Sequence, residues 1–76
     1  MRSFKDYRWI VTDPDLLGGK LVVRGTRLSV SFLLACLSEG MTPEEIRSTY
    51  GAFPQEALSE ILRLAAEQLE APVNAA

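Results

Sequence analysis

The order of apolar and polar positions along the chain predicts two short strands followed by three helices. β-Branched and aromatic residues fill 9–12 and 21–23, and such runs favour pleated strands. The seven residues Asp13–Gly19 between them are too many for a two-residue hairpin, but they allow antiparallel pairing. Apolar residues then recur at helical spacing. The predicted helices cover 30–39, 43–50 and the stretch from Pro54 or Gln55 to about Glu70.

Capping residues mark the starts of these helices. Ser29 is placed to cap the first helix. Thr42 precedes Pro43, which suits the first helical position, and Glu45 follows at the capping-box spacing. A short helix, a turn that contains Gly51 and a longer helix is the order found in helix-turn-helix domains. The predicted fold class is therefore mainly α, with a short N-terminal β element before a three-helix, helix-turn-helix core.

The apolar faces predict what each helix buries. The first helix is apolar on nearly every side, with a stripe of Val30, Leu33, Leu34 and Leu37 and with Phe32, Ala35 and Cys36 outside it. The predicted buried stripe of the third helix comprises Leu58, Ile61, Leu62, Ala65 and Leu69. Residues that one small core leaves off these stripes are Phe32, Cys36, Ala57 and Leu64. We expect a homodimer to cover them, unless the N-terminal strands lie across them.

Length and composition limit the class of protein. With 76 residues the chain holds one domain, and 47% hydrophobic residues place it outside the disordered regime. We expect an N-terminal arm over 1–8 that docks through Phe4 and Tyr7 on a partner surface, a single domain over 9–70 and a mobile tail over 71–76. One cysteine, no signal peptide and no apolar run of about twenty residues favour a cytoplasmic protein without membrane association.

Charge is divided unevenly along the chain. Residues 1–27 hold six cations and three anions, whereas residues 28–76 hold two cations and seven glutamates. The net charge of −2 therefore combines +3 in the first part with −5 in the second. A surface that contacts an anion is expected to come from the N-terminal part.

The residue types argue against an enzyme. The chain contains no histidine, which is the commonest general base and metal ligand. Asp13 and Asp15 flank a proline and suit a turn, while the Glu44–Glu45 pair is explained by the start of a helix. The Gly-Gly-Lys run at 18–20 resembles part of a phosphate-binding loop, but it leads into a strand and lacks the remaining glycine. We predict no catalytic residue, no metal site and no cofactor.

Residues Gly18–Val30 read Gly-Gly-Lys-Leu-Val-Val-Arg-Gly-Thr-Arg-Leu-Ser-Val, and a Pro-Glu-Glu-Ile helix start follows at 43–46. With these motifs, of which Gly18–Val30 is the most specific, the chain between Trp9 and about Ala66 resembles domain-of-unknown-function family 433. The resemblance implies a small, homeodomain-like helix-turn-helix protein. It also implies the antitoxin half of a toxin–antitoxin pair whose toxin resembles a PIN-type ribonuclease. One departure is Pro54, which stands where the family leads us to expect a serine or threonine cap.

Five residues are candidates for contact with operator DNA. Lys20, Arg24 and Arg27 form the predicted anion-contacting group, with Ser59 and Arg63 of the third helix as weaker contacts. The alternative for the two arginines of the first group is an ion pair with helix glutamates or with the turn aspartates. The polar face of the third helix is mainly acidic and would repel phosphate, so direct reading of DNA by this helix is not expected.

Three glutamates of that helix are candidates for contact with a protein partner. Glu56, Glu60 and Glu67 are predicted to pair with a basic nuclease surface. The function predicted is thus a non-enzymatic, antitoxin-like protein that neutralises a PIN-like nuclease and binds its own promoter. The alternative is a protein-interaction module on the same scaffold that does not bind DNA.

Overall fold

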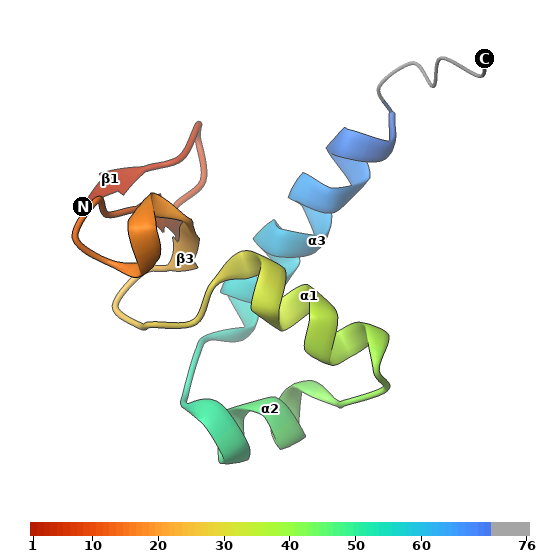
Figure 1. Ribbon diagram of the computed structural model, residues 1–76. Coiled ribbons are helices and arrows are strands. Elements are labelled where there is room, and N and C mark those ends of the chain that lie inside the picture. The colour runs from red at the N-terminus through yellow and green to blue at the C-terminus, as the bar shows by residue number, and fades with distance from the viewer. Residues whose placement is uncertain (71–76) are drawn as a thin grey trace.

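The computed structural model describes residues 1–70, which form a three-stranded antiparallel sheet followed by three α-helices (Figure 1). The elements are β1 (Arg2–Ser3), β2 (Ile10–Thr12), the 3-10 helix η1 (Leu17–Gly19), β3 (Leu21–Val23), α1 (Val30–Ser38), α2 (Pro43–Tyr50) and α3 (Gln55–Leu69). The predicted fold class, a short N-terminal β element before three helices, is confirmed. The predicted tail over 71–76 lies outside the described residues.

The sheet has β2 at its centre and both neighbours antiparallel to it. The pairing of Ile10 with Val23 places two fully buried side chains together on the core side. In the connection from β2 to β3, the Asp13 carboxylate accepts the backbone N–H of Asp15 at 3.0 Å, which is the predicted turn role of Asp13. The outer edge of β3 is partly covered, because the Val23 N–H donates to the Leu28 carbonyl at 2.9 Å.

The N-terminal segment differs from the predicted arm. Arg2 and Ser3 form the third strand of the sheet, and the Phe4 N–H donates to the Ile10 carbonyl at 2.9 Å. Phe4 and Tyr7 are the docking residues, as expected, but they pack on the chain's own core, where Tyr7 is buried. The segment therefore takes its order from this domain and needs no partner surface.

The helix starts follow the local sequence signals. The Ser29 hydroxyl accepts the Phe32 N–H at 3.0 Å, and Thr42 and Glu45 form the complete capping box. Pro54 occupies the N-cap of α3 in extended backbone and gives no side-chain hydrogen bond, so the helix begins at Gln55, one of the two predicted starts. The predicted helix boundaries are thus confirmed to within one residue.

The buried face of α3 is not the predicted stripe. Leu58 and Ile61 are buried as expected, but so are Ala57 and Leu64, whereas Leu62 is 50% and Leu69 82% exposed. The reason is tertiary: α3 packs against β2 and against Tyr7, which lie over one side of the helix only. Among the elements of residues 1–70, no helix is long and apolar enough to cross a membrane.

The positions that the predicted homodimer was expected to cover are mostly covered within the chain itself, and the homodimer stays a prediction. Ala57, Leu64 and Cys36 are all covered within one copy of the chain. Phe32 is exposed but packs edge-to-face on Tyr50, with 4.8 Å between the ring centroids. The alternative, in which the N-terminal elements share in covering these positions, describes the structure better.

Candidate interaction surfaces

Glu60 joins the middle of α3 to the chain segment before β2. Its carboxylate accepts the backbone N–H of Trp9 at 2.7 Å and that of Arg8 at 3.0 Å. Glu60 is half-buried, so a carboxylate predicted to meet a partner instead satisfies two backbone donors of its own chain. More than fifty residues separate these partners in the sequence, and no local pattern indicates the contact.

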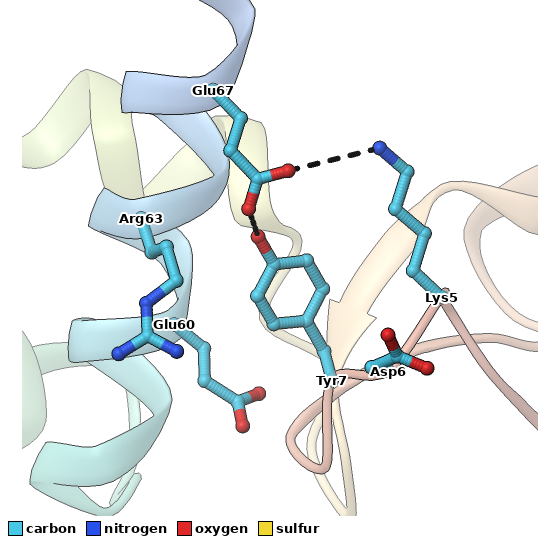
Figure 2. Close-up of a pocket in the computed structure, with 6 residues that line it drawn as sticks. All are labelled: Lys5, Asp6, Tyr7, Glu60, Arg63 and Glu67. Carbon is cyan, nitrogen blue, oxygen red and sulfur yellow. Dashed lines mark hydrogen bonds and ion pairs between the residues drawn. The ribbon is translucent and has the colours of Figure 1, made fainter.

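Glu67 holds the same segment about two turns further along α3. The Tyr7 hydroxyl donates to its carboxylate at 2.5 Å, and the Lys5 ammonium lies 3.9 Å from the other oxygen (Figure 2). The hydrogen bond to the Glu67 carboxylate, with burial and the negative charge of Glu67, raises the pKa of Tyr7 from 10.0 to about 12. Glu67 is thus a second residue that anchors the N-terminal segment.

These contacts border a charged cleft of about 230 Å³ between α3 and the N-terminal segment (Figure 2). Its lining residues are Lys5, Asp6, Tyr7, Glu60, Arg63 and Glu67. Arg63 is exposed, and its guanidinium makes no hydrogen bond or ion pair within the described residues. Two of the three glutamates predicted to bind a partner, Glu60 and Glu67, therefore belong to an internal contact.

The remaining predicted residues of α3 face solvent. Glu56 is exposed, and its carboxylate has no partner between residues 1 and 70. Ser59 is also exposed, and its hydroxyl donates to the Gln55 carbonyl one turn back at 3.5 Å. Neither residue is brought next to the cations of the β3 region by any contact in the structure.

The predicted anion-contacting group is split by its hydrogen bonds. Arg24 is half-buried, and its guanidinium donates to the Arg8 carbonyl at 2.8 Å and to the Ser3 hydroxyl at 2.9 Å. It therefore pairs with neither the helix glutamates nor the turn aspartates. Lys20 and Arg27 are exposed, and within residues 1–70 neither forms an ion pair. Of the three cations in the predicted anion-contacting group, Lys20 and Arg27 are thus the two whose charged groups are not engaged within the described residues.

A second apolar row lies on α3 beside its buried face. Leu62, Ala65 and Leu69 follow one another at spacings of three and four, so they share one side of the helix. The last turns of α3 extend beyond the other elements, and every residue from Ala66 to Glu70 is exposed (Figure 1). The sequence pattern found this row but assigned it to the core.

Arg47 fixes the turn between α2 and α3, a role that the sequence analysis missed. Its guanidinium donates to the Phe53 carbonyl and to the Gln55 side chain, both at 2.9 Å. It also stacks on the Phe53 ring, with 4.6 Å from the guanidinium carbon to the ring centroid. A single arginine in the last turn of a short helix carries no sequence signal that separates it from a solvated residue.

The described residues hold no group of three or more acidic or cysteine side chains placed to bind a metal ion. No curated protein and no solved structure shows significant similarity to the chain. Residues 10–65 match the family described as a protein of unknown function, DUF433. This match begins in β2, spans all of α1 and α2 and ends in the last part of α3. Since it covers most of the chain, including β2, β3, the capped helices and the turn held by Arg47, the protein belongs to the DUF433 family.

Proposed function

We propose that this chain is a non-enzymatic, antitoxin-like protein that binds and neutralises a PIN-type nuclease. The observation that carries the proposal is the apolar row of exposed Leu62, half-buried Ala65 and exposed Leu69 on α3. A helix that lays such a row into an apolar groove is a recurrent mode of protein recognition. The class of partner comes from the family resemblance carried by Gly18–Val30.

Burial of the row would supply much of the binding energy. A leucine side chain contributes about 1.5–3 kcal/mol when it is fully removed from water, and Leu62 and Leu69 still expose half or more of their surface. Small residues beside them, Ala65 and Ala66, allow a partner to approach the helix closely. These features favour a groove on the partner over a flat polar surface.

The charge of α3 supports a basic partner. Residues 55–70 contain four glutamates and one arginine. Glu56 and Glu70 are exposed, whereas Glu60 and Glu67 are engaged by the N-terminal segment. Since a nuclease binds polyanionic RNA, we expect its RNA-binding surface to be basic, and an acidic helix is complementary to such a surface. Occupation of that surface would exclude RNA, which is the means of neutralisation that we propose.

Contact with operator DNA is the second part of the proposal. The observation that favours it is the exposure of Lys20 and Arg27 in the β3 region, on the part of the chain with net charge +3. Arg24 supports it less, because its guanidinium is engaged by Arg8 and Ser3. The same hydrogen bonds of Arg24 favour the alternative function, which is an interaction module that does not bind DNA.

A purified PIN-type ribonuclease provides the test, and any nuclease encoded beside this gene is the first to be tried. RNA cleavage by the purified nuclease is measured as this protein is titrated in, and we expect complete inhibition near equimolar ratio. Leu62→Asp and Leu69→Asp should weaken inhibition by at least about tenfold, since each places a charge in an apolar contact. Ala35→Asp is the matched control, because Ala35 is an exposed residue of α1 outside the proposed contact, and this variant should inhibit like the unchanged protein.

Two results would overturn the proposal. One is a nuclease whose activity is unchanged by an excess of the folded protein. The other is inhibition that survives both aspartate substitutions in α3. For the DNA part, absence of binding to the upstream DNA at low salt would leave the protein partner as the only target.

A further inference from the structure

A second exposed apolar surface lies away from α3, where β3 meets the start of α1. Leu21, Val30 and Leu34 line a groove of about 320 Å³, with Lys20 and Ser31 beside them. Leu34 and Leu21 are only half-buried. The groove is large enough to accept an aliphatic side chain, and burial of one there would remove apolar surface from water on both sides.

An apolar side chain that does not fill the groove is joined to it through the backbone, because the N–H of Lys20 donates to the Leu17 carbonyl at 3.4 Å. Leu17 of η1 is 42% exposed and is not among the residues that line the groove. Its backbone lies at φ +52°, a left-handed conformation that is uncommon for a bulky residue other than glycine. Two glycines follow in the same turn, so the only side chain presented by residues 17–19 is that of leucine.

The charges beside these two features have opposite signs. Asp15 precedes Leu17 by two residues, and Lys20 lies at the groove. Both residues are exposed, and in the part of the chain that the structure describes their charged groups form no ion pair. One loop thus holds an anion beside the projecting leucine and a cation beside the cavity.

We propose that this surface pairs two copies of the chain about a two-fold axis. Leu17 of each copy enters the groove of the other, and Asp15 of each copy faces Lys20 of the other. In a two-fold interface each contact occurs twice with the roles exchanged, so a surface must be complementary to itself. The Asp15–Leu17 and Lys20–groove pairs meet this condition. An unrelated partner would have to present an acidic residue and an aliphatic one at the same spacing.

This pairing is independent of the proposed nuclease contact, since it uses no residue of α3. Measurement of the dimer and measurement of nuclease inhibition can therefore fail separately. The acidic α3 is the less suitable face for a second copy, because two such helices would bring their net negative charges together.

Reversal of the two charges tests the arrangement. The association of the full chain is measured by sedimentation equilibrium for the unchanged protein, Asp15→Lys, Lys20→Asp and the double variant. Each single reversal places like charges opposite one another twice, and we expect the dimer dissociation constant to rise by about tenfold or more. The double reversal restores opposite charges and should return the constant to roughly that of the unchanged protein.

An equimolar mixture of the two single variants identifies contact between copies. In the mixed dimer the two lysines of one copy face the two aspartates of the other, so a heterodimer should form although each variant alone does not pair. If Asp15 and Lys20 attracted each other within one chain instead, mixing the two single variants would not restore a dimer. Leu17→Gly provides a second measure, because it should abolish the dimer while the monomer melts at the same temperature or higher, glycine being free to adopt positive φ.

Three outcomes would overturn the proposal. The unchanged protein could remain monomeric at all concentrations up to its solubility limit. A dimer could form that neither charge reversal nor Leu17→Gly weakens. A dimer could instead be lost in Leu62→Asp, which would assign self-association to α3.

Discussion

The Glu60 carboxylate accepts the backbone N–H of Trp9 at 2.7 Å, and so ties α3 to the residue that enters the sheet. Replacement of Glu60 by alanine leaves this N–H and that of Arg8 without their acceptor. We expect the free energy of unfolding to fall by about 1.5–3 kcal/mol, measured by urea denaturation. Glu56→Ala, on the exposed side of the same helix, is the control and should change it by less than about 0.5 kcal/mol. Equal effects of the two substitutions would contradict a structural role for Glu60.

The hydrogen bond from Tyr7 to Glu67 should be visible in the titration of the phenol. In a Tyr50→Phe background Tyr7 is the only tyrosine, so its phenolate absorbance can be followed alone. We expect a pKa of about 12. Glu67→Gln removes the negative charge that opposes ionisation and should lower the pKa of Tyr7 toward 10.0. An unchanged titration in the Gln variant would mean that Glu67 is not the cause.

The same shift predicts the alkaline limit of stability. Tyr7 holds its proton more tightly in the folded chain than in the unfolded chain, because its pKa is raised from 10.0 to about 12. Its contribution to stability is therefore complete below pH 10 and is lost as the pH rises toward 12. Denaturation curves across this window should show a steeper loss for the unchanged protein than for Tyr7→Phe, which has no phenol to ionise.

The turn before α3 should require the guanidinium group of Arg47, and a lysine at this position should not replace it. Arg47→Ala removes the hydrogen bonds to the Phe53 carbonyl and the Gln55 side chain, and we expect a loss of about 2 kcal/mol in the free energy of unfolding. Arg47→Lys keeps the charge but cannot make both hydrogen bonds, so it should recover less than half of this loss. Arg63→Ala is the matched control on the exposed side of α3 and should be nearly neutral. If Arg47→Lys recovered the full free energy of unfolding, the positive charge of Arg47 alone would explain its role.

Arg24 and Arg27 should separate stability from DNA binding. Arg24→Ala loses hydrogen bonds to Arg8 and Ser3 and should lower the free energy of unfolding by about 1 kcal/mol. Arg27→Ala should leave the free energy of unfolding unchanged but weaken binding to the upstream DNA. The slope of the logarithm of the binding constant against the logarithm of salt concentration should also fall in magnitude by about one. Lys20 is less suitable for this test, because it also takes part in the proposed dimer. Equal DNA binding by Arg27→Ala and the unchanged protein would remove Arg27 from any DNA contact.

Local sequence by itself determined where β2, β3 and the three helices begin and end, but not β1 or η1. β-Branched runs give β2 and β3, and the Thr42–Glu45 capping box and the Ser29 cap set the helix starts, because these signals act within three or four residues. The same local chemistry identified the turn role of Asp13.

Only the tertiary structure decided which side of each helix is buried and which charges are free. On α3 two apolar rows adjoin, and the packing of Tyr7 and β2 chose Ala57 and Leu64 for the core and left Leu62 and Leu69 in water. The Glu60, Glu67 and Arg24 contacts join residues between 16 and 60 positions apart. Hydrogen-bonding groups so distant in sequence meet only when the whole chain has folded, so residue type could indicate their charge but not their partner.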